Sequence, residues 1–269
     1  MRSESFPKSI LYVSQIFLFL LPPSLGCTNV EVTNMNKKYC EINKHQLSRF
    51  IVIPFNELFL LRMRNCPNTI TIKLPFVLDE KVGMLAGMMP DGSLIKDLRR
   101  IYFTQKKDFR KIEQFKELIK ILFRPNHKVF IRQGHNAFEA YTNSTVLVHF
   151  LHHILDFRKS DEQIRIPAWI FNSPDSVKRA YIREAFSMEG TIFKSLKELR
   201  YITKSHNYAL DLHNLLLSLE INSFVRERIA GTPKTVQYRI SVYRKENFDK
   251  FKEIGFTLPM HVERFELIC

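Results

Sequence analysis

Two acidic residues at the ends of apolar helical segments are the side chains best placed to do chemistry. Asp91 ends the segment EKVGMLAGMMPD and Glu189 ends VKRAYIREAFSME; each is followed by a glycine, and they are 98 residues apart. A carboxylate at a helix C-terminus gains nothing from the helix dipole. If the two helices pack side by side, the acids repel each other unless a cation lies between them. Magnesium, which takes carboxylate, water and phosphate oxygens, would there assist phosphodiester hydrolysis. The alternative interpretation is two unrelated acids at helix-ending turns.

The elements that must position these acids occur twice in the same order. The first half has strand patterns over 93–97 and 99–106, a helical pattern over 107–123, strands over 127–134 and 136–143, and a helix over 144–157. The second half has strands over 191–197 and 199–205, a helix over 207–220, strands over 222–231 and 235–244, and a helix over 246–256. With the acid-bearing helix in front, each half has the order αββαββα. The repeat predicts an α+β fold built from two pseudo-symmetric halves.

Charge and composition indicate the class of partner. Among 269 residues, 41 Lys and Arg face 27 Asp and Glu, a net charge of +14. So basic a chain favours a polyanion, most often nucleic acid, although a membrane surface would satisfy the same charge. With 8 glycines and no GxGxxG or GxxxxGK[ST] string, Gly-rich nucleotide-binding loops are excluded.

Cysteines and histidines form no convincing metal or disulfide framework. Cys27, Cys40, Cys66 and Cys269 have no regular spacing, which favours a reducing, intracellular (cytoplasmic) location. The histidines at 149, 152 and 153 are interpreted as ordinary helix residues, since no carboxylate or cysteine nearby completes a ligand set.

The front of the chain is separate in character. Residues 9–21 are apolar and are followed by Pro22 and Pro23, a pattern open to interpretation as a signal peptide or as an accessory segment. We expect an N-terminal extension over 1–69, a first half over 70–160, a linker over 161–173 and a second half over 174–269.

At this point the sequence resembles a known family. MLAGMMPDG (84–92) and IREAFSMEG (182–190) resemble the two motifs of the LAGLIDADG homing endonucleases. Residues 165–190 resemble the linker and second motif of the archaeal single-chain members, and residues 238–256 resemble their last strand and helix. The resemblance implies a monomer whose motif helices form the interface between the halves, with two antiparallel sheets forming a DNA-binding saddle. It also implies a sequence-specific double-strand DNA endonuclease that uses Mg²⁺, with Mn²⁺ as a substitute, and needs no protein partner.

The resemblance also assigns residues. Asp91 and Glu189 would hold the metal, Gln105 would order active-site water, and Lys204 would hold the matching place in the second half. Lys159 corresponds to a basic position near the scissile phosphate, and its partner position falls near His261.

The motif helices depart from the family pattern at contact positions. The third motif position is Ala86 in one helix and Glu184 in the other, and the seventh is Pro90 and Met188 instead of Ala or Gly. An alternative function therefore stays open, namely a catalytically decayed DNA-binding protein or a maturase that assists splicing of structured intron RNA.

The strands carry side chains suited to DNA. Basic, hydroxyl and amide groups alternate with apolar ones, as expected where one sheet face binds phosphates and base edges. A solvated sheet face gives the same pattern. The candidate DNA-binding residues are Arg100, Tyr102, Thr104, Lys128, Arg132, Arg226, Arg228 and Arg239.

Overall fold

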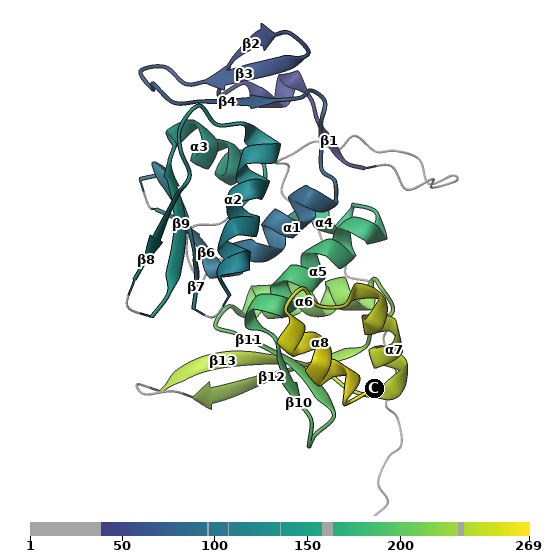
Figure 1. Cartoon of the computed structure of the whole chain (residues 1–269). Helices are drawn as coiled ribbons and strands as arrows, with labels where there is room; N and C mark the ends of the chain where they lie inside the picture. The colour runs from purple at the N-terminus through teal and green to yellow at the C-terminus, as the bar shows by residue number, and fades with distance from the viewer. Residues whose placement is uncertain (1–38, 96, 107, 135, 158–163, 231–233) are drawn as a thin grey trace, which may run out of the picture. The chain divides into compact units, whose positions relative to one another are not determined.

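The fold is known from a computed structural model that describes residues 39–95, 97–106, 108–134, 136–157, 164–230 and 234–269 (Figure 1). The first half follows the predicted order. Its elements are α1 (Glu80–Met88), β6 (Gly92–Leu94), β7 (Arg100–Gln105), α2 (Phe109–Phe123), β8 (Phe130–Gln133), β9 (Phe138–Asn143) and α3 (Thr145–His153). The four strands form an antiparallel sheet in the order β6-β7-β9-β8.

The second half repeats this arrangement. After the short α4 (Ala168–Phe171), it contains α5 (Asp175–Glu189), β10 (Thr191–Phe193), β11 (Glu198–Thr203), α6 (His206–Leu217), β12 (Ser223–Ala230), β13 (Thr235–Val242) and α7 (Lys245–Ile254). Its sheet order, β10-β11-β13-β12, matches the first. A further helix, α8 (Pro259–Glu266), follows the predicted elements. The prediction of an α+β fold of two pseudo-symmetric halves is therefore confirmed.

A small sheet precedes the first half. It consists of β2 (Ile51–Phe55), β3 (Leu58–Arg62) and β4 (Thr69–Ile72), while β1 (Glu41–Ile42) pairs with β5 (Phe76–Val77). Leu61, Ile70 and Ile72 of this sheet are fully buried in the hydrophobic core. The expected boundary at residue 70 thus falls inside β4, and the folded part of the first half extends back to residue 39.

Helices α1 and α5 lie side by side where the two halves meet (Figure 1). The close contact comes from glycines of α1. A Cβ atom added at Gly83 would lie 2.9 Å from the carbonyl oxygen of Val177, and one at Gly87 would overlap the carbonyl oxygen of Tyr181. The glycines of α1 therefore let the backbones of the two helices approach closely.

Proline 90 sets the way in which α1 ends. The α-helix stops at Met88, and residues Met89–Asp91 form a single 3₁₀ turn with Pro90 in its first positions. A proline lacks the N–H needed to continue the helix, but it is tolerated in a first turn. Asp91 is thus presented from a 3₁₀ turn, whereas Glu189 is the last residue of a regular α-helix.

Each four-stranded sheet has a core face and an outer face. Helices pack on the core faces, as shown by Phe103 of β7 stacked on Phe115 of α2 and by Tyr201 of β11 against Phe186 of α5. Alternate residues of each strand point to the opposite side, which we call the outer face.

Strand registers match the two sheets residue by residue. Phe103 pairs with both Gly92 and Ala140, and Tyr201 pairs with Ile240. The pair formed by Thr191 and Arg200 places Gly190 at the level of Tyr201. Phe103 and Tyr201 are therefore equivalent, and the other positions of the two sheets correspond through the same registers.

Within the described residues, no helix is long and apolar enough to cross a membrane.

Candidate active site

The two predicted acids lie together at the ends of the paired helices. The carboxyl groups of Asp91 and Glu189 are close enough for Glu189 to shift the pKa of Asp91. Burial, followed by hydrogen bonding with Glu189 and by its charge, raises the pKa of Asp91 to about 9. Two carboxyl groups in contact cannot both ionise cheaply, so one of them keeps its proton in the absence of a cation.

The donor set at this position fits a divalent metal ion. Carboxylate oxygens are the preferred ligands of Mg²⁺, which usually takes one or two of them together with water and phosphate oxygens. Burial and the neighbouring Glu189 raise the pKa of Asp91, and the positive charge of a bound cation would lower it again. Among the described residues, no group of three His, Cys, Asp or Glu side chains forms a protein-only metal cage. A Mg²⁺ ion held by two carboxylates takes its remaining ligands from water and phosphate oxygens.

Gln105 reaches this site from the end of β7. Its Nε2 donates to the sulfur of Met188, 3.3 Å away, and Met188 immediately precedes Glu189. Gln105 therefore lies next to the residue that precedes Glu189, and its role in ordering water stays a prediction.

The predicted match between Gln105 and Lys204 is displaced by one residue. The register equivalence of Phe103 and Tyr201 makes Thr203, not Lys204, the counterpart of Gln105. Lys204 follows the end of β11, is exposed, and by alternation belongs with the outer face. In the sequence, FTQ (103–105) matches the similar string ITK (202–204), but strand pairing makes FTQ equivalent to residues 201–203 of the other sheet.

The resemblance assigned two further basic positions, at Lys159 and near His261. Lys159 lies outside the described residues. His261 is buried on α8, with its ring 5.6 Å from that of Phe256 in an aromatic cluster of the second half.

Three buried tyrosines lie beside the acid pair. The hydroxyl of Tyr181 on α5 donates to that of Tyr208 on α6 over 3.1 Å, and Tyr201 on β11 reaches the same hydroxyl at 3.5 Å. Burial, and to a smaller extent the charges of Asp91 and Glu189, raise the pKa of Tyr208 to about 12. The three phenols stay neutral and form a rigid polar support next to the acids.

Glu184, which departs from the family pattern, is the centre of a buried polar network. Its carboxylate is fully buried and accepts from Lys111 of α2 over 2.7 Å and from Gln114 over 3.2 Å. The Lys111 ammonium also donates to Gln114 and to Thr257. Glu184 therefore does not disturb the interface; it joins α2 of the first half to α5 of the second.

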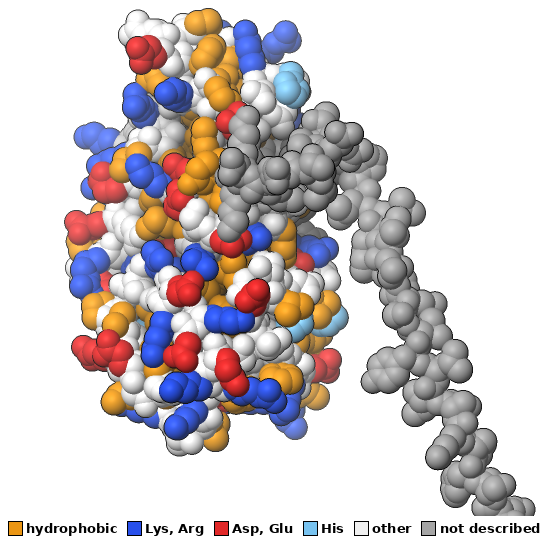
Figure 2. Space-filling view, turned by 90° about the vertical axis from the view of Figure 1, so that its right-hand side faces the viewer, with side chains coloured by type: hydrophobic (Ala, Val, Ile, Leu, Met, Phe, Trp, Pro, Cys, Tyr) orange, Lys and Arg blue, Asp and Glu red, His pale blue; other side chains and the backbone are white. Residues whose placement is uncertain are grey.

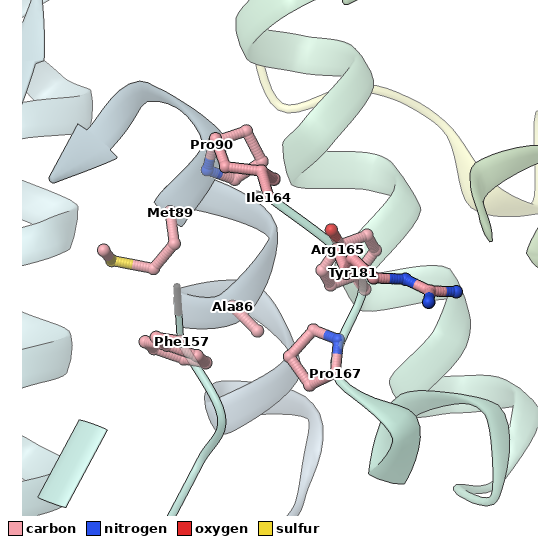
Figure 3. Close-up of a pocket in the computed structure, with 8 residues that line it drawn as sticks. All are labelled: Ala86, Met89, Pro90, Phe157, Ile164, Arg165, Pro167 and Tyr181. Atoms are coloured by element: carbon pink, nitrogen blue, oxygen red, sulfur yellow. The ribbon is translucent and has the colours of Figure 1, made fainter. Parts of the chain in front are cut away.

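Residues 164–167 of the linker lie at the interface between α1 and α5. Figure 3 shows a small pocket, lined by Ala86, Met89, Pro90, Phe157, Ile164, Arg165, Pro167 and Tyr181. The guanidinium group of Arg165 points away from Ala86 and Met89 in this view. It binds both carboxylate oxygens of Asp211, over 3.0 and 2.7 Å, and Asp211 also accepts the backbone N–H of Ile166. These bonds fix the linker against α6.

The outer face of the first sheet combines arginines with aromatic rings. Arg100, Tyr102 and Thr104 of β7 lie on this face, as predicted. The guanidinium groups of Arg100 and Arg132 lie 5.3 and 5.7 Å from the ring centre of Tyr141. Arg100 also donates to Asn143, and Arg132 pairs with Glu139 over 3.0 Å. Lys128 is exposed just before β8.

The outer face of the second sheet carries unneutralised positive charge. Arg226 and Arg239 are directly opposite each other on β12 and β13, and Arg228 lies two residues from Arg226. None of these three arginines forms an ion pair within the described part of the chain, although like charges opposite each other destabilise a sheet. The face shown in Figure 2, by contrast, has Lys and Arg interspersed with Asp and Glu.

Sequence reasoning missed one further feature of this outer face. Arg200 forms a bidentate pair with Glu198, and its guanidinium lies 3.9 Å from the centre of the Phe193 ring. Ser241 donates to the same carboxylate. The alternation of Glu198 and Arg200 in ELRYIT was a visible signal that the two side chains share a face.

Comparison with known proteins agrees with this architecture. Residues 176–255, which contain nearly all of α5 and most of the second half, match the LAGLIDADG-like domain. The crystal structure of the homing endonuclease I-DmoI in complex with DNA and Mn has the same fold, with a TM-score of 0.50, 18% identity, and coverage of 66% of this chain and 97% of that one.

Three curated relatives come from proteins of different kinds. A probable translation initiation factor IF-2 of Methanocaldococcus jannaschii is 24% identical over 73% of this chain. The replication factor C small subunit of the same organism is 29% identical over 66% of this chain, and the probable cell division protein WhiA of Clostridium beijerinckii is 44% identical over 24%. This chain spans only 17%, 10% and 21% of their respective lengths.

Proposed function

We propose that this LAGLIDADG chain is a sequence-specific endonuclease that hydrolyses double-stranded DNA with Mg²⁺, or with Mn²⁺ in its place. The observation that carries the proposal is the contact between Asp91 and Glu189 at the ends of two paired helices. Two acids held in contact from separate halves cost stability, and a divalent cation relieves that cost.

The chain's own residues would divide the work as follows. Asp91 and Glu189 hold the metal, which when bound stabilises charge on the phosphate and makes water more acidic. Gln105, whose amide reaches the residue before Glu189, orients water at the first-half side of the site. Lys204 and Lys159 supply positive charge near the scissile phosphates.

The outer sheet faces would bind the duplex. Arg226, Arg228 and Arg239 form no ion pairs within the described residues and are free to bind phosphates or base edges. Arg100, Tyr102, Thr104, Arg132 and Lys128 offer a second surface on the other sheet. Both surfaces would contact one DNA molecule, with the acid pair between them.

The character of the relatives supports a mobile origin. Regions similar to this chain occur in proteins named for translation initiation, replication and cell division, and this chain spans only 17%, 10% and 21% of their lengths. A domain that inserts itself at new DNA sites would be distributed in this way, which is the behaviour that a homing endonuclease produces.

Cleavage of selected DNA tests the proposal. Duplexes that the full-length protein retains from a random-sequence library would be sequenced, and the enriched duplex incubated with protein and Mg²⁺. We expect a double-strand break at one position in Mg²⁺ and none in EDTA. A protein that enriches a sequence but leaves it intact in both Mg²⁺ and Mn²⁺ would overturn the nuclease proposal.

That contrary result would favour a second candidate, a DNA-binding protein on the same fold. The observation on its side is the group Arg226, Arg228 and Arg239, which form no ion pair within the described residues and need no metal to bind DNA.

A further inference from the structure

Two exposed phenylalanines occupy the same position in the two sheets. Ile131 pairs with Ala140 and Val225 pairs with Ile240, and these partners are equivalent through Phe103 and Tyr201. Phe130 and Phe224, one residue earlier on β8 and β12, are therefore equivalent. Both belong to the outer faces, and 45% and 49% of their surfaces are exposed.

Each phenylalanine lies within a basic surface. Phe130 precedes Arg132 by two residues, and Phe224 precedes Arg226 by two residues, so each pair shares a face of its strand. The arginines can bind phosphates, but an exposed phenyl ring has neither a positive charge nor a hydrogen-bond donor for a phosphate. The two rings need an apolar partner on the molecule that the arginines bind.

The two phenyl rings pack differently against their neighbours. Phe130 is stacked on Tyr141 with 5.4 Å between ring centres and 23° between planes, and Arg100 and Arg132 lie beside Tyr141. Phe224 pairs instead with Ser241, and its ring lies 6.1 Å from that of Tyr243 at a tilt of 52°. Phe130 is therefore the better fixed of the two.

Duplex DNA presents one apolar group at its base edges, the 5-methyl group of thymine in the major groove. We infer that Phe130 and Phe224 each pack on a thymine methyl group and so determine part of the target sequence. This inference rests on the proposed binding of duplex DNA by the outer sheet faces. Because the two residues are equivalent, the target should have a thymine at corresponding distances from its centre, on opposite strands.

Replacing thymine by uracil removes only the methyl group and tests the inference directly. The duplex enriched from a random library by the full-length protein would be synthesised with uracil at one, the other, or both of these positions. We expect each uracil to weaken binding about fourfold, the equivalent of one methyl group withdrawn from water. The effect should be larger opposite Phe130.

Protein variants assign each position. Phe130→Ala should remove the difference between thymine and uracil at one position and keep it at the other, and Phe224→Ala should do the reverse. Phe130→Leu, which keeps an apolar side chain, should retain most of the difference. Ile121→Ala, at an exposed apolar residue of α2, is the control and should change neither.

The outcomes separate the inference from the proposed function. Enrichment of a sequence with equal affinity for thymine and uracil, or an unchanged preference in Phe130→Ala and Phe224→Ala, would overturn the thymine contacts alone. Failure of the wild-type protein to enrich any duplex would overturn both this inference and the proposed function.

Discussion

Asp91 illustrates how one residue responds to the packing of whole helices. Its pKa is raised to about 9 because the carboxyl group is buried against Glu189. In the unfolded chain the same group loses its proton near pH 4. Between these values the folded state binds the extra proton, so rising pH destabilises the metal-free protein.

The pH dependence of thermal unfolding checks this account. In EDTA, the melting temperature should fall as pH rises from 5 to about 9, with a slope of at most about 1.4 kcal/mol per pH unit from this group. Asp91→Asn, which has no proton to lose, should flatten that dependence and melt higher than wild type at the alkaline end. A wild-type curve that rises with pH over this range would contradict the raised pKa.

Lys111 and Glu184 form the second residue-scale feature. Both side chains are almost completely buried, and removal of one partner leaves a buried charge unpaired. Lys111→Met should therefore lower the free energy of unfolding by about 3–5 kcal/mol, measured by urea denaturation. Adding Glu184→Leu should restore most of the loss. Lys120→Met, at an exposed pair with Glu117 on the same helix, should cost less than about 1 kcal/mol; an equal loss in both lysine variants would argue against the buried pair.

At the scale of elements, the interface between α1 and α5 depends on glycine from one side only. A methyl group at Gly87 would overlap the backbone of Tyr181 and force the helices apart. Gly87→Ala should lower stability by about 1–3 kcal/mol and should also lower the pKa of Asp91 as the acids separate. Gly134→Ala, in a hairpin where a Cβ meets its nearest atom at an ordinary 3.4 Å, is the matched control. Equal melting temperatures for the two variants would show that the helices tolerate a wider spacing.

Sequence patterns predicted the elements better than their contacts. The repeated order and the two acids were visible because helical and strand periodicities are local, and α2, predicted over 107–123, forms at Phe109–Phe123. The partner of Glu184 lies 73 residues away in the chain, and no local pattern reveals such a distant pairing. The position of Lys204 was misjudged because strand register is fixed by pairing with β13, not by the string YITK.

At the scale of the whole molecule, the folded part of the first half begins before the motif. Truncation to residue 70 would remove β2 and β3 and uncover Ile70 and Ile72, which are fully buried. A chain starting at residue 39 should keep a cooperative thermal transition, and one starting at residue 70 should lose it. Comparable melting of the two truncated proteins would show that the small sheet is dispensable.

The net charge of +14 should appear as a steep salt dependence of DNA binding. Each phosphate contact contributes about −0.9 to the slope of log K against log salt. Arg226→Gln should make the slope shallower by about one unit, whereas Arg179→Gln, already paired with Glu253, should leave it unchanged. An unaltered slope in Arg226→Gln would remove that residue from the phosphate-binding surface.

In the proposed function, Asp91 and Glu189 hold one shared metal on which both strand cuts depend. The most direct measurement follows cleavage of each strand of the selected duplex in Mg²⁺ by the wild type, Asp91→Asn, Glu189→Gln and the surface control Asp249→Asn. We predict that each of the first two substitutions abolishes both cuts while DNA binding persists, and that the control cuts like the wild type. Loss of one strand cut only, or full cleavage by either acid variant, would contradict a shared site.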